Sequence, residues 1–135
     1  MTFTFELGLI VTGVVTSPNH PSHYPDNLRK TETIKVEEGL VLALQFTAFS
    51  IESHFTCGYD HLTIRDGDGT TLMEKRCGSS LPANTILSTS NRVELYFKTD
   101  LSGTYSGWSV SWSAVTQGEC QNVSVKARIC CSFAK

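Results

Sequence analysis

Apolar and polar side chains alternate along several short stretches of this chain. In "HLTIRDG", Leu62 and Ile64 alternate with polar residues, and "RVELYFK" and "GWSVSWSAV" follow the same period of two. Such a period places one set of side chains on the buried face of a β-strand and the other set toward solvent. The stretch "LVLALQFTAF" is apolar almost throughout, which favours a central strand that is covered on both sides.

Turn signals separate these stretches at short intervals. They include "SPNHPSHYPDN", "EEG", "RDGDGT", "SLPANT" and "SGTYSG", and no stretch keeps a sustained helical period. The pattern predicts roughly eight or nine strands, which is typical of an all-β protein built as an antiparallel sandwich.

The chain length fits one compact domain. At 135 residues it is long enough to bury a sizeable core. Alternation stops near Val115, so we predict a domain over 13–115, preceded by an N-terminal strand within 1–12. Residues 116–135 then form a linker or the beginning of another module. No segment is long and apolar enough to span a bilayer, and "MTFTFELGLIVTG" lacks the positive start of a signal peptide.

The cysteines indicate an oxidising compartment. Cys57 and Cys77 flank a strand and a turn, and a bridge between them would close a loop of about 20 residues and stabilise the fold by roughly 3 kcal/mol. Cys120, Cys130 and Cys131 crowd the C-terminus, so at least one cysteine lacks a partner within the chain and is available for an intermolecular bridge or a neighbouring domain. With the glycosylation sequon at Asn122, this favours a secreted, extracellular glycoprotein.

Charge excludes some partners. The net charge of -2 gives no basic footprint for nucleic acid. The sequence also shows no lysine- or arginine-rich stripe for an anionic membrane surface.

Three acidic residues stand where predicted strands begin or end. Glu52 follows the long apolar run, Asp60 precedes "HLTIRDG", and Asp100 follows "RVELYFK". If these strand ends converge, the carboxylates repel one another unless a hard cation such as calcium binds between them. Backbone carbonyls of "DLSGTYSG" could complete such a site. The spacing alone leaves the alternative of three solvated loop residues open.

Longer motifs resemble a known family. "GVVTSPNHPSHYPDN" is followed in order by "FTAFSIE", "CGYDHLTIRDG", "CGSSLP", "STSNRVELYFKTD" and "SGWSVSW". Together, from about Gly13 to Val115, these motifs resemble a CUB domain, the sandwich module of extracellular proteins. The resemblance implies a jelly-roll-like antiparallel sandwich and a bridge between Cys57 and Cys77.

The resemblance also implies a site. Many members of the family bind calcium through acidic residues at the places of Glu52, Asp60 and Asp100, completed by a backbone carbonyl at Ser102. These acids also accept a lysine or arginine of a protein partner, and Tyr24 could pack beside that side chain at the rim. The expected function is therefore non-catalytic, calcium-dependent recognition of an extracellular protein.

The match has two departures. Many members carry an earlier bridge, but no cysteine precedes Cys57 here, so the first disulfide is absent. The opening "MTFTFELGLIVTG" also matches the start of the family poorly. We expect the core to stabilise the domain and the first strand to be held less firmly.

Other interpretations concern catalysis and different ligands. The sequence has no "HExxH" or "GxSxG", so an enzymatic role would come from a larger secreted protease to which this domain is an accessory. Carbohydrate or glycosaminoglycan binding would need exposed aromatic residues or a basic patch. His20 and His23 have the spacing of a zinc pair but no evident third ligand. "DGDG" is best explained as a hairpin turn.

Overall fold

The computed structural model describes residues 11–117, which form an all-β fold with no helix. Eight strands follow one another in this part of the chain: β1 Thr12–Thr16, β2 Arg29–Lys35, β3 Leu40–Ser50, β4 His61–Asp66, β5 Thr71–Arg76, β6 Ile86–Leu87, β7 Arg92–Lys98 and β8 Gly107–Thr116. Because the segment contains no helix, it offers none that could cross a membrane.

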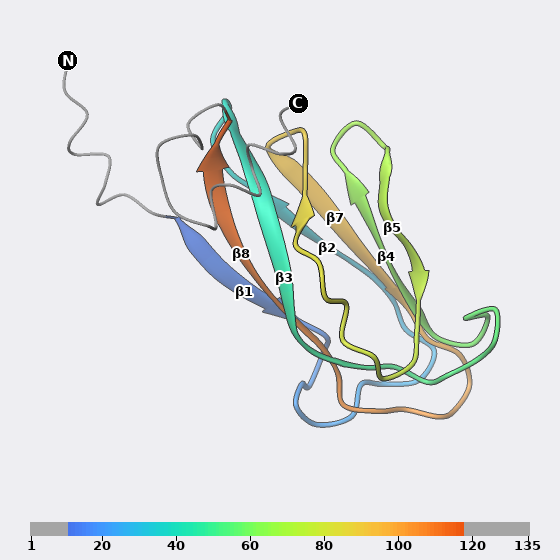
Figure 1. Cartoon of the computed structure of the whole chain (residues 1–135). Coiled ribbons are helices and arrows are strands. Elements are labelled where there is room, and N and C mark those ends of the chain that lie inside the picture. Colours follow the sequence, from blue (N-terminus) through green and yellow to red (C-terminus); the bar gives the residue numbers. More distant parts are fainter. Residues whose placement is uncertain (1–10, 118–135) are drawn as a thin grey trace, which may run out of the picture.

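The strands form two facing sheets (Figure 1). The first sheet has the order β1-β8-β3-β6 and the second has the order β2-β7-β4-β5. Every strand pair is antiparallel. The antiparallel sandwich predicted from alternation is therefore confirmed.

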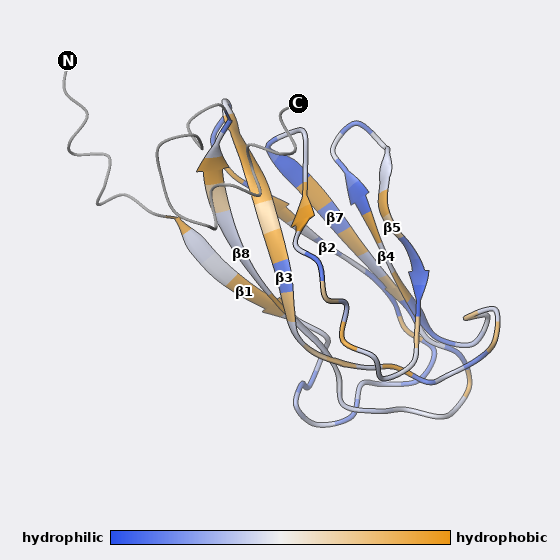
Figure 2. Cartoon of the chain, in the orientation of Figure 1, coloured by the Kyte–Doolittle hydropathy of each residue, from blue (hydrophilic) through white to orange (hydrophobic). Residues whose placement is uncertain are grey.

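The core lies between the sheets, where the alternating apolar positions meet. In β7, Val93, Leu95 and Phe97 are buried, and Figure 2 shows hydrophobic positions alternating with hydrophilic ones along this strand. Phe97 packs edge-on against Tyr24 and Trp108, with ring centroids 4.9 and 5.8 Å apart. These aromatic contacts close the core near the end of the sandwich that carries the acidic residues.

The long strand β3 is buried on both faces at Val41 but is exposed on its outer face further along. It lies between β8 and β6, and Leu42, Leu44 and Phe46 are buried in the core. Gln45 and Thr47, which point the other way, are exposed. The expectation of cover on both sides therefore holds at Val41 and Leu42 and is wrong from Gln45 onward.

The "DGDG" stretch forms the turn between β4 and β5. Asp66 donates its backbone N–H to the Thr70 carbonyl at 2.7 Å, and Gly69 donates to the Asp66 carbonyl at 2.9 Å. The hairpin interpretation is confirmed. Asn122, Cys120, Cys130 and Cys131 lie outside the described residues, as do residues 1–10.

Candidate metal centre

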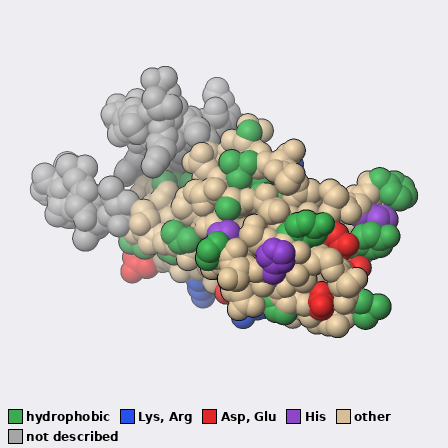
Figure 3. Space-filling model, turned by 90° about the horizontal axis from the view of Figure 1, so that it is seen from below, with side chains coloured by type: hydrophobic (Ala, Val, Ile, Leu, Met, Phe, Trp, Pro, Cys, Tyr) green, Lys and Arg blue, Asp and Glu red, His purple; other side chains and the backbone are tan. Residues whose placement is uncertain are grey.

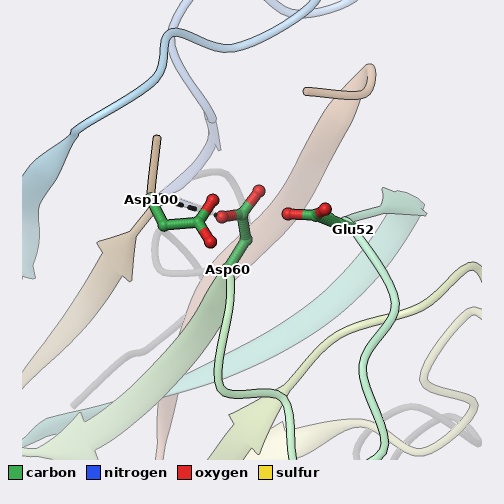
Figure 4. A group of neighbouring side chains, drawn as sticks. All are labelled: Glu52, Asp60 and Asp100. Atoms are coloured by element: carbon green, nitrogen blue, oxygen red, sulfur yellow. Dashed lines mark hydrogen bonds between the residues drawn. The ribbon is translucent and has the colours of Figure 1, made fainter. Parts of the chain in front are cut away.

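Three strand ends bring three carboxylates to one place. Glu52 stands two residues after β3, Asp60 directly before β4 and Asp100 two residues after β7. One carboxylate oxygen from each lies within 4.8 Å of the others, and Figure 4 shows the three side chains turned toward a common point. Within residues 11–117 this is the one group of three or more acidic, histidine or cysteine side chains placed to hold a metal ion.

Strand pairing explains how two of these acids meet. His61 of β4 lies opposite Lys98 of β7, so the residues just beyond this pair, Asp60 and Asp100, are neighbours. Asp100 donates its backbone N–H to Asp60 Oδ1 at 2.9 Å, the contact drawn as a dashed line in Figure 4. The Asp60 side chain is 1% exposed and is thus fixed by the sheet itself.

Tyr24 connects Asp60 with the third acid, Glu52, from inside the sandwich. Its hydroxyl donates to Asp60 Oδ2 at 2.8 Å and accepts the backbone N–H of Glu52 at 3.0 Å. Burial is the main reason why the pKa of Tyr24 is raised, so the hydroxyl stays protonated and keeps donating. The ring is 1% exposed, and the expectation that Tyr24 lies at the rim against a partner is therefore wrong.

Backbone hydrogen bonds fasten the loops around the acids. Asn27 donates to the Asp100 carbonyl at 2.8 Å, and Tyr24 donates to the Tyr105 carbonyl at 3.0 Å. Gly103 follows Ser102 and has a positive φ of 88°. A methyl group on Gly103 would overlap the Glu52 carboxylate, so the chain just after Ser102 runs directly against this acid.

The loop between Glu52 and Asp60 is held by a disulfide and a histidine. Cys57 and Cys77 are bridged with their Cα atoms 5.5 Å apart, which confirms the pairing implied by the family resemblance. His54 Nδ1 accepts the backbone N–H groups of Thr56 and Gly58, each at 3.2 Å. The sequence analysis missed this role of His54, because "SHFTCGYD" carries no turn signature that identifies the acceptor.

The carboxylates lack enough donors to satisfy them. Glu52 Oε1 and Asp100 Oδ1 are buried atoms without a hydrogen-bond partner, although buried polar atoms are usually paired. Burial raises the pKa of Asp60. Burial also raises the pKa of Glu52, and the carboxylates of Asp60 and Asp100 raise it further. Negative charge is thus gathered without compensation, which is the arrangement that a hard cation with oxygen ligands fits.

The two histidines of the proline-rich turn take other partners. His20 Nδ1 lies 2.7 Å from the Ser106 carbonyl, and His23 Nδ1 lies 3.3 Å from Thr104 Oγ1. Neither belongs to the candidate metal-binding group of residues 11–117. Trp108 is buried in the core, and Trp112 packs against it while half-buried.

Exposed apolar side chains flank the acids. Phe55 is 92% exposed and Leu101 is 78% exposed, and Tyr59 and Tyr105 are also exposed. Two of them belong to the loop that ends at Asp60, and two follow Asp100 in the chain. Figure 3 shows acidic, hydrophobic and histidine side chains gathered at this end of the molecule, seen from below.

Comparisons with known proteins identify the family of this chain. The family model of the CUB domain matches residues 10–112. Rat cubilin is 34% identical over 104 residues, which cover 77% of this chain and 3% of cubilin. Rat mannan-binding lectin serine protease 1 is 36% identical over 106 residues, which cover 76% of this chain and 15% of the protease. The chain thus spans a small fraction of the relatives it matches.

A solved structure matches both fold and sequence. The MASP-1 CUB2 domain bound to Ca2+ superimposes with a TM-score of 0.65 at 34% identity, covering 75% of this chain and 90% of that domain. The family match covers more than half of the sequence, and the two-sheet sandwich agrees with it. The chain belongs to the CUB domain family.

Proposed function

We propose that this CUB domain binds calcium through Glu52, Asp60 and Asp100, with the Ser102 carbonyl as a further ligand. The observation that carries the proposal is the convergence of three carboxylates within 4.8 Å, two of which have a buried oxygen without a partner. A calcium ion would supply positive charge and accept these oxygens as ligands. The Ca2+-bound MASP-1 CUB2 domain supports this assignment by its similarity.

The same site is proposed to dock a lysine or arginine of a protein partner. Carboxylate oxygens of Glu52 and Asp100 form charge-assisted hydrogen bonds with such a side chain. Glu52 and Asp100 are half-buried and remain accessible, whereas Asp60 is held inside by Tyr24. The exposed side chains of Phe55 and Leu101 provide apolar surface on either side, as the centre of a protein interface requires.

The domain is proposed to act as a non-catalytic extracellular recognition module. Its disulfide is of the kind that persists in oxidising compartments. The alternative role, as an accessory domain of a secreted protease, is supported by the similarity to a serine protease of which the chain spans 15%. In both cases the ligand would be recognised by the same acidic site.

Calorimetric titration tests the calcium site. The wild-type chain should bind calcium with measurable heat. Asp100→Ala should show no heat, because the two carboxylates that remain are too few to hold the ion. Glu38→Ala is the matched control, since Glu38 is an exposed acid on the turn before β3. Equal heats from wild type and Asp100→Ala would overturn the proposed site.

A small probe tests the docking of a basic side chain. N-acetyl-lysine methylamide, titrated in the presence of calcium, should shift the amide signals of Tyr59 and Leu101 in nuclear magnetic resonance spectra. The norleucine analogue has a similar stem without the charge and should leave them in place. Identical shifts from both compounds, or shifts that persist with chelator, would contradict docking at the calcium site.

A further inference from the structure

The outer face of the second sheet gathers most of the basic residues. Residues 11–117 contain eight lysines and arginines: Arg29, Lys30, Lys35, Arg65, Lys75, Arg76, Arg92 and Lys98. Six of them belong to what we call the basic face: Arg29, Lys35, Arg65, Lys75, Arg92 and Lys98. The sequence predicted no basic stripe, and the structure corrects this, because the six residues come from four strands that lie apart in the sequence.

Alternation shows why these side chains point outward. Val93, Leu95 and Phe97 of β7 are in the core, so Arg92 and Lys98 lie on the opposite side of the strand. The same argument applies to β2, where Ile34 is buried, and to β4, where Leu62 and Ile64 are buried. Arg29 and Lys35 of β2 and Arg65 of β4 therefore lie on the same outer face.

The strand register aligns part of this face into a row. Arg29 lies opposite Lys98, and Lys98 lies opposite His61 on its other side. On β5, Arg76 lies opposite Leu62, whose side chain is buried in the core, so the neighbouring Lys75 faces the outer side and extends the row. With neighbouring strands about 4.8 Å apart, the row spans roughly 14 Å across four strands.

Few negative charges interrupt the basic face. Glu94 pairs with Arg92 at 2.7 Å. Glu74, which belongs to β5, lies near His61 of β4. Lys30, by contrast, pairs with Glu32 at 3.4 Å and shares the inner side of β2 with Ile34. The row of Arg29, Lys98 and Lys75 thus carries an excess of positive charge, although the whole chain has a net charge of -2.

The chemistry of the face favours a hydrated polyanion. The exposed large hydrophobic side chains of residues 11–117 are Val11, Val14, Phe55, Tyr59, Leu81, Leu101 and Tyr105. None of them belongs to β2, β7, β4 or β5. A protein interface needs an apolar centre, and an interfacial membrane anchor needs apolar side chains to insert. A ligand recognised by charge alone needs neither.

We propose that the basic face binds a sulfated polysaccharide of the cell surface or extracellular matrix. Such a polysaccharide carries several fixed anionic groups along an extended chain. These groups complement the row of cationic side chains that runs across the sheet. This site lies on the outer face of β2-β7-β4-β5 and uses none of the acidic residues. Binding is consequently independent of calcium, and the two sites allow the domain to hold a protein ligand and a polysaccharide together.

Heparin serves as the probe, and the full chain is used throughout. The double variant Arg29→Ser/Lys98→Ser should bind about tenfold more weakly at physiological salt, because each lost ionic contact removes part of the counterion release on binding. The matched control, Lys30→Ser/Arg76→Ser, loses the same two charges elsewhere and should bind as wild type does. Chelator should leave all affinities unchanged.

Each further outcome supports or overturns the proposal. Loss of binding to chemically desulfated heparin supports recognition of sulfate. Equal weakening by both double variants, or none by either, overturns the basic face as the site. Stronger binding to phosphatidylserine vesicles than to heparin would assign the face to a membrane surface instead. Calcium binding is measured separately, so failure of the heparin test leaves the proposed calcium site unaffected. Failure of the calcium test likewise leaves the proposed polysaccharide site unaffected.

Discussion

Strand β4 has a buried aspartate at each end, and the two environments are opposite. Asp60 before the strand is 1% exposed and Asp66 at its end is 3% exposed. The Asp66 carboxylate accepts four hydrogen bonds, from the backbone N–H of Gly67, the backbone N–H and hydroxyl of Thr89 and the hydroxyl of Ser90. Asp60 accepts two, from Tyr24 and Asp100, and shares its surroundings with two further carboxylates.

The difference appears in the direction of the pKa shifts. Burial would raise the pKa of Asp66, but its hydrogen bonds with Ser90, Thr89 and Gly67 together outweigh burial and lower it. At Asp60 burial prevails, and the pKa is raised. A buried carboxylate with enough donors stabilises the fold, whereas one surrounded by like charge would be stabilised by a bound cation. The two ends of one strand therefore separate a structural role from the proposed ligand-binding role.

The largest expected effect on stability is at the Asp66 end of β4, where hydrogen-bond donors surround the carboxylate. Asp66→Ala leaves the donors of Gly67, Thr89 and Ser90 without their acceptor inside the fold. We expect the free energy of unfolding to fall by about 3 kcal/mol, because hydrogen bonds to a charged group are involved. Urea denaturation in chelator measures it, with Asp68→Ala on the same turn as control. A loss below that of the control would contradict the comparison.

The same residue predicts a pH dependence. Because the pKa of Asp66 is lowered in the folded state, its ionised form stabilises the fold above the unfolded-state pKa of about 3.9. That stability is lost as pH falls through the folded pKa, by at most about 1.4 kcal/mol per pH unit. The difference between wild type and Asp66→Asn should thus be constant from pH 7 to 5 and shrink in more acidic solution. A difference that grows on acidification would contradict this sign.

A smaller effect is expected from the tyrosine beneath the acidic site. Tyr24→Phe removes the donor to Asp60 and the acceptor for the Glu52 backbone but retains the packing against Phe97. We expect a loss of about 1 kcal/mol in chelator and weaker calcium binding, measured by denaturation and calorimetry. Tyr96→Phe on the basic face is the control. Unchanged calcium affinity would show that Tyr24 does not position the ligands.

The smallest effect has the opposite sign. Glu52→Gln removes one of three repelling charges from a half-exposed position, so stability in chelator should rise by about 0.5 kcal/mol. The same variant should lose its response to calcium. Denaturation curves with and without chelator separate the two effects, and a substantial loss of stability in chelator would contradict mutual repulsion at this site.

Much of the fold and the acidic cluster could be predicted from the sequence. Alternation in "RVELYFK" identified the buried residues of β7. The strand-end positions of Glu52, Asp60 and Asp100 left convergence open, and the resemblance to the CUB family implied that the three acids share a site. The role of Asp66 could not be predicted, since Thr89 and Ser90 follow it by more than twenty positions. These contacts depend on how the loops pack, which local patterns do not encode.

Two further differences have the same cause. Tyr24 lies in a proline-bracketed turn that reads as exposed surface, yet the turn folds back so that the ring enters the core between Phe97 and Asp60. The basic face could not be recognised in the sequence, because strand pairing, not sequence proximity, places Arg29 opposite Lys98. In both cases residues that are distant along the chain become neighbours only in the folded sandwich.

The most direct test of the central claim is the stability of the wild-type chain with calcium and with chelator. If the cation relieves the repulsion at the Asp60 end of β4, free calcium at a hundred times its dissociation constant should raise the free energy of unfolding by about 2.7 kcal/mol. Asp100→Ala should show no rise, and Asp66→Ala should show the full rise from a lower baseline. Identical wild-type unfolding curves in calcium and chelator would contradict the claim.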